Sequence, residues 1–235
     1  MRLHNLLSES RKRLAPLEDP FDVDLGLHRW LKDEREEAYS DWLEWVVQQI
    51  LEILGPKQVF ELFDLKPPEA VLESREWDVQ RECCVPHGHP DQEGRLDLVI
   101  RFRENAIIVV EVKKGDAEGA DTDKHRGYSR WIEEQNYPHK YAVLLAASAE
   151  EEDYKGFPFR SWATVCVEMR RLAIEIYKEG RAMTAAMVLA FVAAVEQNLL
   201  GFSSKIVQDI CEGHLALFNV AVVDHLEKFI KRLEE

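Results

Sequence analysis

The sequence predicts an α/β fold, in which a central mixed β-sheet is flanked by helices. Apolar residues first follow a helical spacing, then alternate or run continuously over several short segments, and then return to helical spacing. Hydrophobic residues make up 46% of the 235 residues, which is enough for a sizeable core. We therefore expect a single domain, with an α/β core at about 33–180 and a helical extension at about 182–235.

Two helices are expected before the sheet. Arg2 to Leu14 has the pattern of a short amphipathic helix. A second helix should begin near Asp33, which can cap it, with Glu36 three residues later as the capping-box partner. Gly55-Pro56 should end this helix. Its apolar stripe consists of Leu43, Val46, Val47, Ile50, Leu51 and Leu54.

Five segments then have the character of strands. They are Trp77–Val85, Leu96–Phe102, Ile107–Val112, Tyr141–Ala147 and Trp162–Val167. In the second segment Leu96, Leu98, Ile100 and Phe102 should share one face, and Asp97 should lie on the other. The third segment is apolar on both faces, which is typical of a central strand covered by helices. Helices are expected at Asp121–Gln135 and from about Glu168 to Lys178.

The C-terminal part is expected to be helical. The apolar run from Ala182 to Val195 is too short to cross a bilayer, which needs about 20 residues. A buried helix is the favoured reading, and a homodimer through the C-terminal helices is a second expectation. Residues 1–17 lack the apolar core of a secretory signal, and the four cysteines lack zinc-ligand spacing. We therefore expect a cytoplasmic protein with reduced thiols and no membrane contact.

The net charge is −14, which excludes binding of nucleic acid through bulk charge. Any such contact must use a local basic patch. Basic residues do concentrate around the third segment; they are Arg95, Arg101, Arg103, Lys113, Lys114, Lys124, Arg126 and Arg130. This set predicts either a rim that contacts phosphates or a solvated face of ion pairs, and the sequence leaves both open.

Charged residues at the ends of two apolar strands predict a metal site. Glu111 and Lys113 are two apart on one strand, so their side chains should leave the same face. Asp97 lies on the neighbouring strand, about 4.8 Å away. Asp97, Glu111 and the carbonyl of Val112 could then hold one Mg²⁺ or Mn²⁺, since these ions prefer oxygen ligands. The alternative is a salt-bridged cluster without metal, and Glu82 could add a further carboxylate or lie on the surface.

These residues resemble the PD-(D/E)xK nuclease superfamily, which has the restriction-endonuclease-like fold. The motif is carried by Asp97 and by Glu111-Val112-Lys113. The segment from Glu36 to Leu43 is similar to the helical E-x-x-x-S-x-x-L segment of a bacterial and phage branch, in which the helix Glu approaches the metal. The resemblance covers roughly 33–167. It implies a catalytic set of Asp97, Glu111, Lys113 and Glu36.

Two positions depart from the family pattern. Leu96 stands where the motif often has Pro. Related enzymes also often carry a Gln and a Tyr four apart on the helix after the catalytic strand; Tyr128 fits, but Lys124 replaces the Gln. A lysine can contact a phosphate as a point charge. Arg95, Lys114, Lys124 and Tyr128 are therefore the expected nucleic-acid contacts.

The expected function is a Mg²⁺-dependent nuclease that hydrolyses phosphodiester bonds, with DNA endonuclease activity favoured. The alternative is a catalytically silent module of the same fold in a defence or mobile-element assembly, which the net charge of −14 and Lys124 favour. Metal and phosphate chemistry are common to DNA and RNA, so the sequence does not separate the two substrates.

Overall fold

The computed structural model describes residues 31, 36–72, 74–86, 93–115, 122–148 and 156–201, without the side chains of residues 93 and 122–126. Its elements are α3 (Glu36–Ile53), α4 (Pro56–Leu62), α5 (Glu69–Leu72), β1 (Asp78–Pro86), β2 (Glu93–Phe102), β3 (Ala106–Val112), α6 (Thr122–Glu134), β4 (His139–Ala146), β5 (Phe159–Ser161), α7 (Trp162–Lys178) and α8 (Ala182–Asn198). The predictions for Arg2–Leu14, for the cap at Asp33 and for the chain after residue 201 lie outside the described residues.

Within the described residues, the sheet has five strands in the order β1-β2-β3-β4-β5. β1 to β3 form an antiparallel meander, and β4 and β5 continue the sheet in parallel with β3. The connection from β3 to β4 runs through α6, as a parallel pairing requires. The sheet is therefore mixed, and the predicted α/β class is confirmed.

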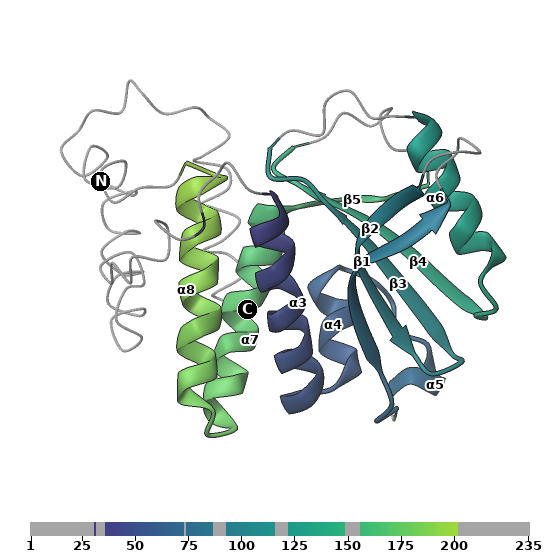
Figure 1. The fold of residues 1–235 in the computed structure, drawn as a ribbon. Coiled ribbons are helices and arrows are strands. Elements are labelled where there is room, and N and C mark those ends of the chain that lie inside the picture. Colours follow the sequence, from purple (N-terminus) through teal and green to yellow (C-terminus); the bar gives the residue numbers. More distant parts are fainter. Residues whose placement is uncertain are drawn as a thin grey trace, which may run out of the picture.

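Helices cover both faces of the sheet. α3, α4, α7 and α8 lie on one side and α6 on the other (Figure 1). The larger core joins the first group to the sheet through residues such as Leu43, Phe60 and Phe191. The smaller core joins α6 to the sheet through Tyr128 and Ile132. All of β3 is buried, so the apolar run on both its faces is explained by this double cover.

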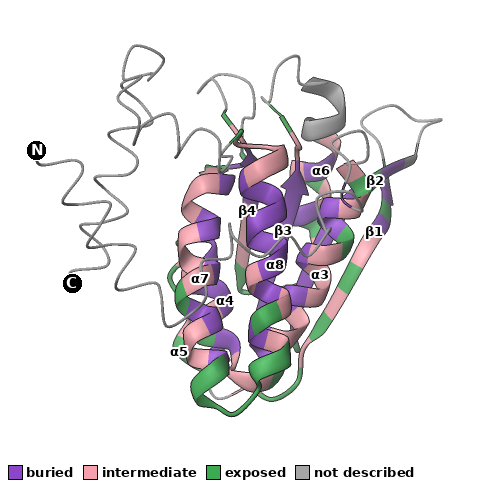
Figure 2. Cartoon of the chain, turned by 90° about the vertical axis from the view of Figure 1, so that its left-hand side faces the viewer, coloured by how far each residue is buried: buried purple, intermediate pink, exposed green. Residues whose placement is uncertain are grey.

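α8 lies beside α3 and α7, and much of its surface is buried (Figure 2). Its residues from Ala190 to Glu196 are buried. Phe191 stacks on Trp42 of α3 with ring centroids 6.0 Å apart, and Glu196 forms an ion pair with Arg170 of α7. Among the described helices, none has both the length and the apolar character needed to cross a membrane. The homodimer stays a prediction.

Two element predictions were wrong. The segment Trp162–Val167 is not a strand but the start of α7, because Ser161 caps the helix by accepting a hydrogen bond from the Thr164 amide at 3.1 Å. The last strand is only the preceding Phe159–Ser161. The prediction also missed α4: Gly55, with φ 91°, does end α3, but Pro56 then begins the next helix.

Candidate active site

The candidate site forms where β2 separates from β3. The two strands are paired from Phe102 and Ala106 up to Leu98 and Val110. On its other edge, β3 stays paired with β4 as far as Val112, and the Lys113 amide then donates to the Leu145 carbonyl at 2.7 Å. The end of β3 is thus held firmly on one side and open on the other.

Asp97 fills the opening. Its Oδ2 accepts a hydrogen bond from the Val112 amide at 2.7 Å, in the place of a carbonyl from a neighbouring strand. This contact puts the Asp97 carboxylate beside the main chain that links Glu111 to Lys113. The expected approach of Asp97 to the end of β3 is therefore present.

An irregularity shared by β1 and β2 accompanies the separation, since the pairing of these strands skips Glu82 and Asp97. Glu82 has φ 48°, a left-handed conformation that is uncommon for a residue other than glycine. Leu98 belongs to the larger core, whereas Leu96 belongs to the smaller core on the opposite face. The prediction that Leu96 and Leu98 share one face was therefore wrong. Asp97 lies at the point where β2 changes faces.

Glu111, Lys113 and Glu36 meet at the end of β3. Glu111 is fully buried, and its Oε1 lies 3.2 Å from the Lys113 Nζ. The same ammonium lies 3.0 Å from Glu36 Oε1 and 3.2 Å from the Val112 carbonyl oxygen. Glu36 Oε2 also accepts the Lys114 amide at 3.2 Å. Glu36 at the start of α3 therefore reaches the motif residues, as expected from the upstream segment.

The charges in this cluster perturb each other strongly. Burial raises the pKa of Asp97 to about 7; the neighbouring Glu111 adds to the shift, and the Val112 amide and Lys113 oppose it. Burial alone would lower the pKa of Lys113, but Glu111, Asp97 and Glu36 outweigh burial and raise it above its usual value. Lys113 is therefore a permanent cation among three carboxyl groups.

The site offers donor types that suit a hard divalent cation. Asp97 and Glu111 offer carboxylate oxygens and Val112 offers a carbonyl, which are the ligand types that Mg²⁺ and Mn²⁺ prefer. The pKa of Asp97 is raised mainly by burial, and the repulsion from Glu111 adds to the shift although Lys113 opposes it. Within the described ranges, no three His, Cys, Asp or Glu side chains are grouped so as to hold a metal ion. Glu36 is engaged with Lys113 and Lys114 instead.

The residues expected to contact nucleic acid differ in their exposure and in their ion pairs. Arg95 is exposed, but its guanidinium pairs with Glu82 at 3.1 Å. Lys114 is half-buried near the cluster. The side chain of Lys124 lies outside the described part of the chain. Other members of the basic set also form ion pairs, Arg101 with Asp78 at 2.9 Å and Arg103 with Glu76 at 3.3 Å.

Tyr128 does not have the position of a contact residue. It is fully buried, and its hydroxyl accepts from the Arg95 amide at 2.9 Å and donates to the Arg95 carbonyl at 2.7 Å. A Cβ added at Gly94 would lie 2.5 Å from the Tyr128 ring. Tyr128 thus fixes α6 to β2 close to Asp97, and the expected role as a nucleic-acid contact is corrected to this packing role.

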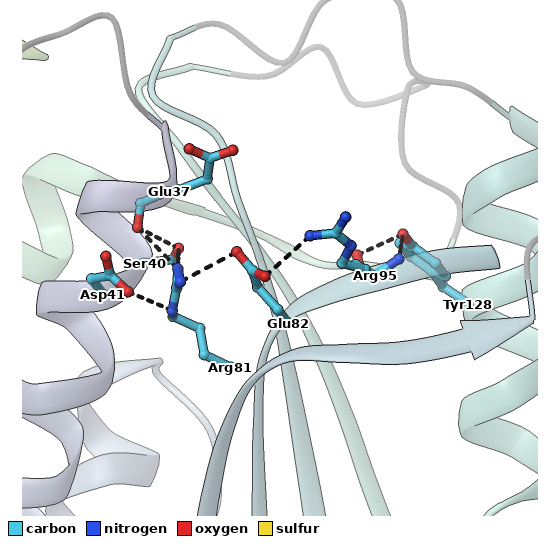
Figure 3. Close-up of polar contacts among 7 residues, drawn as sticks. All are labelled: Glu37, Ser40, Asp41, Arg81, Glu82, Arg95 and Tyr128. Carbon is cyan, nitrogen blue, oxygen red and sulfur yellow. Dashed lines mark hydrogen bonds and ion pairs between the residues drawn. The ribbon is translucent and has the colours of Figure 1, made fainter.

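Sequence reasoning missed two residues that shape the site. Trp162 is buried at the start of α7, and its indole Nε1 donates to the Lys113 carbonyl at 2.8 Å, so it fixes the main chain just beyond β3. Arg81 of β1 contacts the first turns of α3 (Figure 3). The available signal for Arg81 was its place in the alternation Val79, Arg81, Cys83, Val85, where an apolar residue is expected.

Comparison of the chain with protein-family models, with curated proteins and with solved structures finds no match. The functional interpretation therefore depends on the geometry and chemistry of the site.

Proposed function

We propose that the protein is a metal-dependent nuclease that hydrolyses phosphodiester bonds, with Mg²⁺ as its cofactor and DNA as the favoured substrate, cut in endonuclease mode. The observation that supports this proposal is the convergence of Asp97, Glu111 and Lys113 at the open end of β3. A buried carboxylate is costly unless it is paired or metal-bound. The structure keeps Glu111 fully buried at this position. The resemblance to the PD-(D/E)xK superfamily and its restriction-endonuclease-like fold is part of the same proposal.

Asp97, Glu111 and the Val112 carbonyl would hold the metal. When bound, Mg²⁺ supplies a Lewis acid for a phosphoryl oxygen and lowers the pKa of a coordinated water. In the hydrolysis, the water oxygen would lose a proton to solvent and form a bond to phosphorus. The bond from phosphorus to the leaving sugar oxygen would break, and that oxygen would gain a proton from solvent. Lys113 would stabilise negative charge on the phosphoryl oxygens and orient the attacking water.

Lys113 also contacts two of the three proposed ligands, Glu111 Oε1 and the Val112 carbonyl. An ammonium at these oxygens competes with a divalent cation for them. Glu36 provides a third partner, 3.0 Å from the Lys113 Nζ, that is not among the proposed ligands. We therefore assign to Glu36 the role of retaining Lys113 when its contacts with Glu111 and Val112 are given up.

The decisive experiment is incubation of the full chain with single- and double-stranded DNA and RNA, in Mg²⁺, in Mn²⁺ and in chelator. Linear and circular substrates separate exonuclease from endonuclease activity. Asp97→Asn and Glu111→Gln are nearly isosteric and should abolish metal-dependent cleavage. Cleavage that survives in both variants, or that is equal in chelator, would refute the proposal.

The second candidate is a catalytically silent module of the same fold in a defence or mobile-element assembly. The ion pairs that engage Arg95, Arg101 and Arg103 favour it, because these guanidinium groups are less available to phosphates. The net charge of −14 acts in the same direction. Calorimetry with Mn²⁺ separates the two candidates: the silent module predicts no heat and no thermal stabilisation by the ion.

A further inference from the structure

Arg81 is the main link between β1 and the start of α3 (Figure 3). Its Nε lies 2.6 Å from Asp41 Oδ1, and its Nη1 donates to the Glu37 carbonyl at 3.2 Å. Nη1 also lies 3.4 Å from the Ser40 hydroxyl, which is buried. All three partners lie within five residues of Glu36, the first residue of α3.

The far side of the same guanidinium is fixed to the strand pair that carries Asp97. Its Nη2 lies 3.2 Å from Glu82 Oε1, and Glu82 Oε2 lies 3.1 Å from Arg95 Nη1 on β2 (Figure 3). Tyr128 holds the main chain of Arg95 through two hydrogen bonds. A continuous series of polar contacts therefore runs from α3 across β1 and β2 to α6.

The first turn of a helix lacks intrahelical partners for its amides and frays readily. Glu36 nevertheless places both of its carboxylate oxygens, one on the Lys113 ammonium and one on the Lys114 amide. Such placement needs a support for the turn that carries Glu36. Arginine suits this role because its planar fork of donors reaches several acceptors in fixed geometry, which a lysine cannot do.

We propose that Arg81 is a positioning residue that holds the first turn of α3, and with it Glu36, against Lys113 and Lys114. Arg81 contacts none of the proposed metal ligands, so it acts through Glu36. The consequence for metal binding depends on the proposed function, whereas the placement of Glu36 does not.

The placement can be tested without metal by amide hydrogen exchange at Lys114, whose amide donates to Glu36. Arg81→Gln should speed exchange of this amide about tenfold, as should Glu36→Ala, which removes the acceptor. Arg101→Gln is the matched control, because Arg81 and Arg101 side chains are 20% and 21% exposed and each pairs with an aspartate. The control should leave Lys114 protected. Equal protection in Arg81→Gln and Arg101→Gln would overturn the proposal.

A double-mutant cycle on Mn²⁺ affinity tests the route through Glu36. Arg81→Gln and Glu36→Gln should each weaken Mn²⁺ binding, and the double variant should bind no more weakly than Glu36→Gln alone. Additive losses would show that Arg81 acts by another route. If the wild type binds no Mn²⁺, the proposed function fails, and the Lys114 exchange still decides the role of Arg81.

If Arg81→Gln does not fold, Asp41→Asn replaces it in both experiments. Asp41 is 56% exposed and is the charged partner of the same guanidinium, so its loss should leave the core intact. The expected directions are the same. Unchanged Lys114 exchange in a folded Asp41→Asn protein would then count against the proposal.

Discussion

The two edges of β3 are paired differently along Glu111, Val112 and Lys113. Along β4, backbone pairing continues to Val112 and is extended by the hydrogen bond from Lys113 to Leu145. Along β2, pairing ends at Val110, and the Asp97 side chain takes over the Val112 amide. The comparison teaches that β3 is held by backbone pairing on one edge and by a charged side chain on the other. The charged cluster lies at the edge where a side chain replaces the backbone partner.

The largest expected effect is the loss of cleavage when Glu111 is replaced. Glu111→Gln keeps the shape of the side chain and removes its charge, so cleavage should fall about 10³-fold, the loss typical of removing a group that organises transition-state charge. The measurement is the rate of metal-dependent cleavage by a variant whose circular dichroism and thermal unfolding match the wild type. A fall of less than tenfold would show that the buried carboxylate is not part of the reaction.

The next effect is on the pH dependence of the unfolding free energy, through Asp97. The folded-state pKa of Asp97, about 7, lies above the ordinary value of 3.8, so the folded protein binds more protons and loses stability as pH rises between these values. Asp97→Asn removes this loss and can still accept the Val112 amide. Without metal, the variant should gain stability over the wild type from pH 4 to pH 7, by up to about 4 kcal/mol, and the gain should level off above pH 7.

Urea unfolding with chelator across this pH range checks the prediction. Asp78→Asn provides a control, because Asp78 is an exposed carboxylate on the neighbouring strand that pairs with Arg101. A stability difference for Asp97→Asn that does not change with pH would contradict the raised pKa.

A smaller effect on stability is expected from the hydrogen bond that Trp162 donates to the main chain just beyond β3. Trp162→Phe removes the indole donor to the Lys113 carbonyl but keeps an aromatic ring in the core. The unfolding free energy should fall by about 2 kcal/mol, from the lost hydrogen bond together with the lost ring volume. Phe60→Leu is the comparison variant, because Phe60 is a buried core residue whose aromatic neighbours are Phe102 and Tyr141. Cleavage should decline more in Trp162→Phe than in Phe60→Leu. Equal activity in the two variants would show that the hydrogen bond from Trp162 does not shape the site.

The smallest expected effect is a change in Mn²⁺ affinity when Lys113 is replaced. Lys113→Met should tighten Mn²⁺ binding about tenfold, or about 1.4 kcal/mol, because the ammonium no longer competes for Glu111 and Val112. The same variant should cleave poorly, since it lacks the charge that faces the phosphoryl oxygens. Calorimetric titration measures the affinity. Weaker Mn²⁺ binding in this variant would indicate that Lys113 supports the metal site and does not compete with it.

The sequence predicted the strands that carry the site well, because their apolar residues leave little choice of structure. Asp97, Glu111, Lys113 and Glu36 meet as expected from the spacing and the resemblance. The face of Leu96 could not be predicted, since alternation assumes a regular strand, and β2 changes faces at Asp97, beside the left-handed Glu82 of β1. The role of Arg81 depends on contacts with α3 some forty residues earlier, which no local pattern contains.

The start of α7 shows a different limit to predicting secondary structure from sequence. Thr164, Val165 and Val167 are β-branched and favour a strand by propensity, but the hydroxyl of Ser161 begins a helix there. Likewise, Pro56 reads as the end of one helix and is in fact the start of the next. In both places a single capping or initiating residue outweighed the preferences of its neighbours.

The position of Lys113 has a consequence for the life of the protein before any cofactor arrives. Lys113 supplies a positive charge of the chain itself among the buried carboxyl groups, so their burial does not depend on a bound cation. If the proposed function holds, withdrawal of magnesium should stop cleavage without unfolding the protein, and resupply should restore cleavage.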